Sequence, residues 1–100
     1  MELSENARQV LGYISPMGGE HEVPLRKIAD SISKSYATAQ HALKEIREAG
    51  YPVCSSNRGV YLARNVAEME EYVRMTSARV QELCNTLAAA RAALKYMKGE

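Results

Sequence analysis

The chain has 100 residues, of which 46% are hydrophobic and 25% charged, and its formal net charge is +1. This length provides one small hydrophobic core and argues against two ordinary domains or an elaborate enzyme. No apolar run approaches the roughly 20 residues that cross a bilayer, and the acidic N-terminus has no signal-peptide core, so we expect a cytoplasmic protein without a membrane partner.

Two short helices are predicted first. The stretch LSENARQVLGYI repeats apolar residues every three or four positions, which predicts a helix over about residues 4–15. A proline and two glycines follow, and the residues HEV before Pro24 are expected to be extended, because a residue before proline is pushed out of the α region. The segment after Pro24, LRKIADSI, has the stripe of a second short helix.

The next segment, SKSYATAQHALKEIREAG at residues 33–50, predicts a turn, an N-cap at Ser35 and a third helix that ends at Gly50. Its first two turns carry the hydrogen-bonding side chains of Tyr36, Thr38, Gln40 and His41 where exposed helices usually carry Glu and Lys. We assign Glu45 and Glu48 to the outward face of the same helix. Two short helices joined by a tight turn form a helix-turn-helix, which places its second helix in the major groove of DNA.

A β-hairpin is predicted after the third helix. The stretches YPVCSS and GVYLA alternate β-branched or aromatic residues with others, and they flank a polar tip that contains Asn57, Arg58 and Gly59. Cys54 and Cys84 lie 30 positions apart with no clustered His or Asp. We therefore expect two free thiols, no metal site and no cofactor.

Charge is distributed unevenly along the chain. Residues 1–23 contain one base and four acids, whereas residues 24–64 contain seven bases and three acids. The remaining residues are balanced. Positive charge is thus concentrated in the middle segment, where a nucleic-acid surface would need it.

Residues 66–97 follow a heptad pattern that is typical of a coiled coil. The predicted seam contains one polar residue, Thr76, and consists of Val66, Met69, Val73, Thr76, Val80, Leu83, Leu87, Ala90, Leu94 and Met97. The apolar stripe could fold back over the core of the same chain. A helix of about 48 Å is longer than a core of some 60 residues, however, so part of the stripe needs another partner and we favour a homodimer. The Val residues of the seam favour two parallel helices, whereas the alanines also allow two antiparallel helices to pack closely. Both orientations of the dimer therefore stay open.

The residues from Pro24 to Ala63, PLRKIADSISKSYATAQHALKEIREAGYPVCSSNRGVYLA, resemble the winged helix-turn-helix domain at the N-terminus of biotin repressors and of many small bacterial and phage regulators. The matching features are the L-x-x-I-A helix, the Ser cap, the helix that ends in E-x-G and the hairpin that ends in G-V-Y-L. The resemblance covers about residues 4–64. It implies a mainly α protein with a small β-hairpin (α+β), in which a winged helix-turn-helix domain (1–64) precedes a long C-terminal dimerisation helix (65–100).

The resemblance also implies roles for individual residues. It implies base contacts from the front of the third helix, phosphate contacts from His41 and Lys44, and a backbone or minor-groove contact from Arg58. The predicted DNA-binding set is Lys34, Ser35, Tyr36, Thr38, Gln40, His41, Lys44, Asn57 and Arg58. Two features depart from the family: His41 stands where many relatives have Arg, which would weaken a phosphate contact or make it depend on pH, and the wing has a single cation.

Simpler roles exist for three of these residues: Tyr36 packing against the second helix, His41 as an ordinary surface residue and Arg58 as a solvated hairpin tip. We predict sequence-specific double-stranded DNA binding by a dimeric transcription or replication regulator of bacterial or phage type. The alternative is an adaptor or inhibitor that uses the winged helix and the long helix to engage another protein. An enzyme is not expected, because the sequence has no nucleophile with a base, no paired carboxylates and no phosphate loop.

Overall fold

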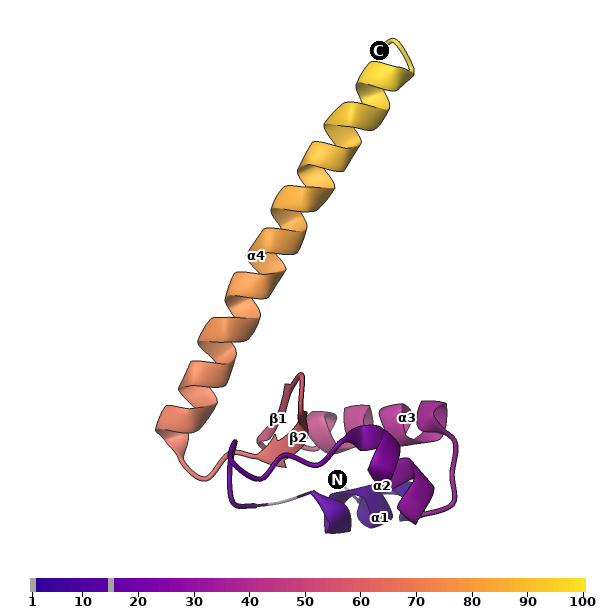
Figure 1. Cartoon of the computed structure of the whole chain (residues 1–100), viewed down its shortest axis with the longest axis vertical. Helices are drawn as coiled ribbons and strands as arrows, with labels where there is room; N and C mark the ends of the chain where they lie inside the picture. The colour runs from indigo at the N-terminus through magenta and orange to yellow at the C-terminus, as the bar shows by residue number, and fades with distance from the viewer. Residues whose placement is uncertain (1, 15) are drawn as a thin grey trace. The chain divides into compact units, whose positions relative to one another are not determined.

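A computed structural model describes residues 2–14 and 16–100. This part of the chain is mainly helical, with one antiparallel hairpin and a long C-terminal helix, which confirms the α+β class in its coarse form (Figure 1). Within it, no helix is long and apolar enough to span a membrane. In chain order, the elements are α1 (Glu5–Tyr13), α2 (Leu25–Ser31), α3 (Tyr36–Glu48), β1 (Val53–Ser56), β2 (Gly59–Leu62) and α4 (Val66–Met97).

The chain divides into two compact units, the first ending at Met69 and the second beginning at Glu70. The N-terminal unit contains α1, α2, α3, the hairpin and the first turn of α4. Its core consists of the apolar stripes of the three short helices together with one side of the hairpin. Ile28, Ile46, Val10 and Val53 are among its largest fully buried side chains.

The first helix is held at its start by α3. The Ser4 side chain caps α1 by accepting a hydrogen bond from the Ala7 backbone N–H at 3.2 Å. Glu45 of α3 accepts two hydrogen bonds from Ser4, from its backbone N–H at 2.6 Å and from its hydroxyl at 2.9 Å. The assignment of Glu45 to the outward face is therefore wrong, because its carboxylate joins α3 to the start of α1. The helix ends at Tyr13, and Ser15, where the predicted helix ended, lies outside the described residues.

The hairpin is joined to the segment that precedes α2. Val53 pairs with Leu62 and Ser56 with Gly59 across the two strands. On the other side of β2, the backbones of Val23 and Val60 exchange two hydrogen bonds of 2.9 Å each. The extended conformation predicted before Pro24 is thus used to attach this segment to the hairpin.

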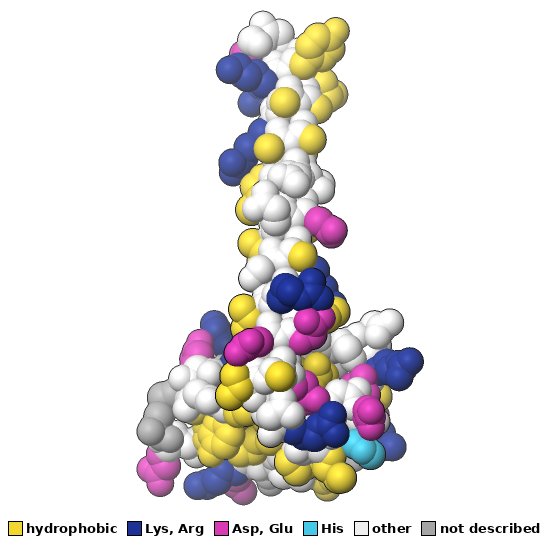
Figure 2. Space-filling view, turned by 90° about the vertical axis from the view of Figure 1, so that its left-hand side faces the viewer, with side chains coloured by type: hydrophobic (Ala, Val, Ile, Leu, Met, Phe, Trp, Pro, Cys, Tyr) yellow, Lys and Arg dark blue, Asp and Glu magenta, His cyan; other side chains and the backbone are white. Residues whose placement is uncertain are grey.

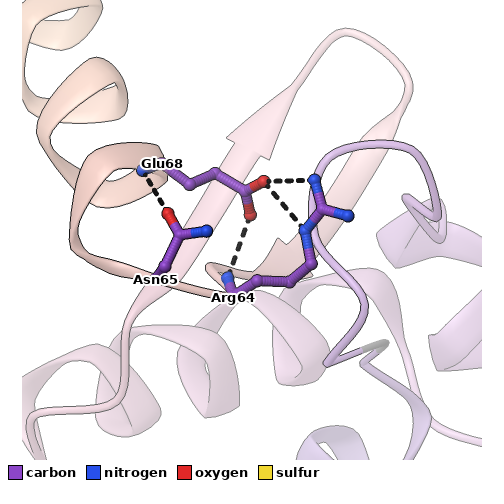
Figure 3. A network of polar contacts seen from close by, with 3 residues as sticks. All are labelled: Arg64, Asn65 and Glu68. Atoms are coloured by element: carbon purple, nitrogen blue, oxygen red, sulfur yellow. Dashed lines mark hydrogen bonds and ion pairs between the residues drawn. The ribbon is translucent and has the colours of Figure 1, made fainter.

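The first turn of α4 is anchored to the N-terminal unit by polar contacts (Figure 3). The Asn65 side chain accepts a hydrogen bond from the Glu68 backbone N–H at 2.9 Å, as an N-cap does. The Arg64 backbone N–H donates to the Glu68 carboxylate at 3.0 Å, and this contact holds the pKa of Glu68 below its ordinary value. The Arg64 guanidinium adds an ion pair at 3.1 Å. Because a lowered carboxyl pKa stabilises the fold above the ordinary pKa, acidification weakens this anchor.

Beyond its first turn, α4 carries a series of exposed apolar side chains. None of the residues of α4 is buried, and its hydrophobic side chains are exposed along its length (Figure 2). Val80 and Leu83, for example, are 55% and 69% exposed. A run of exposed large apolar residues on one element usually marks an interaction surface.

We expect a fragment that ends at Met69 to fold on its own. Its core residues all lie within the N-terminal unit, and it keeps the contact of 3.7 Å between the sulfur atoms of Cys54 and Met69. Circular dichroism should show a helical spectrum and a cooperative thermal transition. A matched fragment that ends at Asn65 loses Glu68 and Met69 and should be less stable by roughly 1–3 kcal/mol. An unfolded 1–69 fragment would mean that the rest of α4 completes the core.

Candidate nucleic-acid interface

The front of α3 is fixed by its cap. The Ser35 hydroxyl accepts a hydrogen bond from the Thr38 backbone N–H at 3.1 Å and lies 2.9 Å from the Thr38 hydroxyl. Before the cap, Ser33 adopts a left-handed conformation with φ of 57°. The Lys34 backbone N–H donates to the Ala29 carbonyl at 3.0 Å, which closes the turn between α2 and α3. The predicted turn and the predicted N-cap at Ser35 are confirmed.

A groove of about 490 Å³ opens between the start of α2, the side of α3 and the hairpin. We call it the arginine groove, because three arginines, Arg26, Arg47 and Arg58, contribute to its wall. Its lining contains no Asp or Glu and consists of Pro24, Leu25, Arg26, Tyr36, Gln40, Leu43, Arg47, Ser55, Ser56, Asn57, Arg58, Gly59 and Val60. Three cations around one concave surface form a site that suits an anion.

Two of the arginines are held in place by neighbours. The Arg26 guanidinium lies over the Tyr36 ring, 4.5 Å from its centroid, which is a cation–π contact. The Arg47 guanidinium donates a hydrogen bond to the Ser55 hydroxyl of β1 at 3.2 Å. Arg58 stands at the exposed tip of the hairpin, where its backbone N–H donates to the Ser56 hydroxyl at 3.2 Å. The groove therefore combines two guanidinium groups held by neighbouring side chains with a third at the exposed hairpin tip.

The groove brings together four of the predicted site residues: Tyr36, Gln40, Asn57 and Arg58. Tyr36 contacts Arg26 of α2 and also lines the groove. Its packing against α2 and its position in the candidate site are therefore compatible. The remaining predicted residues do not line the groove, and they are Lys34, Ser35, Thr38, His41 and Lys44.

These other residues lie at different positions around α3. At about 100° per residue, Thr38 is some 160° around the helix from Gln40, and its hydroxyl is engaged by the cap. His41 and Lys44 are exposed, and together with Gln40 they occupy the outward side of the helix. Lys44 is paired with Glu48 at 4.0 Å, but both side chains are more than half exposed, so this pair is weak.

Two of the three groove arginines, Arg26 and Arg47, were not in the predicted set. Arg47 lies seven residues after Gln40, which puts both on one side of a helix, so helical spacing could have identified it. Arg26 gives no such signal, because it comes from a different helix and only folding places it beside Tyr36.

The cysteines do not contribute to the groove. Cys54 lies in the hairpin and is buried, and this burial raises the pKa of its thiol. Cys84 is exposed on α4, and both thiols are free. Among the described residues, no group of three or more His, Cys, Asp or Glu side chains could hold a metal ion.

Comparisons of the chain with models of protein families, with curated proteins and with solved structures gave no match. The features of the chain that bear on its function are the arginine groove, the exposed face of α3 and the exposed stripe of α4.

Proposed function

We propose that this protein is a dimeric, sequence-specific double-stranded DNA-binding regulator, in which the N-terminal unit acts as a winged helix-turn-helix domain and α4 joins two copies. The observation that carries the proposal is the arginine groove, which borders the exposed, hydrogen-bonding side of α3 and lacks acidic residues. The position of the hairpin beside this helix supports its role as the wing.

Each part of this surface has a chemical role in the proposed complex. Gln40 is exposed and can form two hydrogen bonds with the edge of an adenine in the major groove. Arg47 and Arg26 offer guanidinium groups to phosphate, to which they can donate two parallel hydrogen bonds. Arg58 and Asn57 at the hairpin tip would reach the backbone or the minor groove. Phosphate contacts position the protein, whereas base contacts specify the sequence.

A protein-interaction adaptor is the second candidate, and one observation favours it. Lys44, a predicted phosphate contact, is adjacent to Glu48, so the outward side of α3 carries both charges. An adaptor would use α4 to bind a different chain and would leave the groove without nucleic acid. The two candidates differ in whether affinity for DNA exists at all and falls steeply with salt.

Two substitutions should have different effects on DNA binding. Gln40→Ala should reduce the preference for a site selected from random duplexes by roughly 1–3 kcal/mol per half-site, because each subunit loses one base contact. Arg58→Gln should instead weaken binding to selected and random DNA alike and reduce the slope of log K against log salt by about 1.8, because the dimer loses one phosphate contact of about 0.9 from each of its two subunits. Fluorescence anisotropy at several salt concentrations measures both quantities.

Arg8→Gln is the matched control, because it removes the same charge from an exposed position on α1, outside the arginine groove. Its salt slope should equal that of the wild-type protein. If Arg58→Gln and Arg8→Gln change the slope equally, the groove is not the DNA surface. If the wild-type protein binds no duplex at low salt with a Kd below about 0.1 mM, the DNA proposal fails and the adaptor takes its place.

A further inference from the structure

The charges on α4 are separated along its length. Residues 66–82 contain four acids and two bases, whereas residues 83–98 contain three bases and no acid. A parallel pair of such helices would place like halves together. An antiparallel pair directs the acidic start of each helix, residues 68–71, towards the basic end of the other, residues 91–98, and it also opposes the two helix dipoles.

We infer that a second copy of this chain covers the exposed stripe of α4 in the antiparallel direction, with residues 73–97 of the two copies paired. This inference rests on the proposed dimer and specifies its geometry. The alanine-rich stretch at residues 88–93 supports it, because small side chains allow two helices to approach closely.

The register follows from the contacts of Met69. Its sulfur lies 3.7 Å from Cys54, and it belongs to the N-terminal unit, so it does not join the seam. The free seam then begins at Val73 and ends at Met97. Aligning these two residues across the antiparallel pair matches Val80 with the partner's Ala90 and Leu83 with the partner's Leu87.

Charge complementarity also favours this register. In the positions that flank the seam, it places Glu70 beside the partner's Lys98 and brings no two like charges together. Ser77 faces the partner's Arg91 on the same side. In a parallel coil, none of the flanking pairs along residues 72–98 would join opposite charges. Those pairs would be Tyr72 with Ser77, Arg79 with Cys84, Thr86 with Arg91 and Ala93 with Lys98.

The orientation can be measured with nitroxide spin labels on the full-length protein. Cys84→Ser with Lys95→Cys leaves one exposed thiol, because Cys54 is buried and its raised pKa disfavours the reactive thiolate. In the antiparallel dimer the two labelled positions are 20 residues apart along the coil axis, or about 30 Å. In a parallel dimer they lie at the same level, within about 20 Å.

Asn85 provides the matched control. It lies at the centre of the antiparallel pair, so labels at this position sit at one level in either orientation and give a short distance. A long distance at position 95 with a short distance at position 85 supports the inference. Equal short distances at both positions would overturn it and leave the proposed dimer intact. The absence of any pair distance would overturn the dimer as well, whatever the outcome of the DNA measurements.

Charge reversal tests the register without labels. Glu70→Lys or Lys98→Glu alone should raise the dimer dissociation constant by roughly 3- to 10-fold at low salt, since each change affects two symmetric pairs. The two changes together should restore the wild-type value. If the double variant instead dissociates more readily than either single variant, with the two effects adding, Glu70 does not pair with the partner's Lys98.

Discussion

The double variant Val80→Asp and Leu87→Asp should be a monomer that binds DNA about 10²- to 10⁴-fold more weakly than the wild-type protein. Both side chains are exposed in the single chain, at 55% and 49%, so the substitutions cost the monomer little. In the dimer they would bury four unpaired carboxylates in an apolar seam, which costs several kcal/mol. Loss of the second DNA-binding unit then removes the gain from linked binding.

Sedimentation equilibrium at tens of micromolar gives the oligomeric state, and anisotropy gives the affinity. The matched control is Ala78→Asp with Asn85→Asp, which introduces the same charges at the same spacing on the side of α4 away from the seam. This control should remain dimeric. A double variant that still dimerises, or a control that dissociates equally, would show that the predicted seam is not the interface.

Gly59→Ala should destabilise the N-terminal unit by roughly 2–4 kcal/mol. Gly59 has φ of 145°, a conformation that residues with a side chain rarely adopt, and an added Cβ would lie within 3 Å of the Val23 backbone. The methyl group therefore must push apart the junction between β2 and the segment before α2. For a unit of this size, the thermal midpoint should fall by roughly 10–25 °C, measured by circular dichroism on the full chain.

Gly12→Ala is the matched control for this substitution. It makes the same chemical change in α1, where an added Cβ meets no atom within 4 Å. Replacing a helical glycine by alanine should raise stability by up to about 1 kcal/mol. If both variants melt at the wild-type temperature, the close approach of Gly59 and Val23 does not constrain the fold.

The sequence was sufficient to predict the elements of this fold, because each has a local signal. The stripe of α3, its cap at Ser35 and its end near Gly50 depend on residues within a few positions of one another. The junction of Val23 with Val60 was not predicted, because a single bridge between residues far apart has no periodicity. Glu45 looked like a surface acid for the same reason, since its partner Ser4 is 41 residues away.

The candidate site was predicted only in part. Gln40 and Arg58 attracted attention as polar residues at a helix front and a hairpin tip, and they lie in the arginine groove. The groove itself depends on distances among α2, α3 and β1, which no short segment encodes. Thr38 was predicted to contact a base because it lies near the start of α3. In the structure it does not line the groove, and its hydroxyl interacts with the capping residue Ser35.

The lack of any buried residue in α4 has a consequence for how this protein responds to its own abundance. A lone helix in water is only marginally stable, so in the proposed dimer the segment from Glu70 onwards would gain its order mainly from the second copy. Ordering of this segment would then require two chains to meet, so the amount of ordered segment would depend on the square of the monomer concentration. In the dilute limit, doubling the amount of chain raises the amount of ordered dimer about fourfold by mass action. Occupancy of a DNA site would therefore rise more steeply than expression, and the N-terminal unit would stay folded throughout.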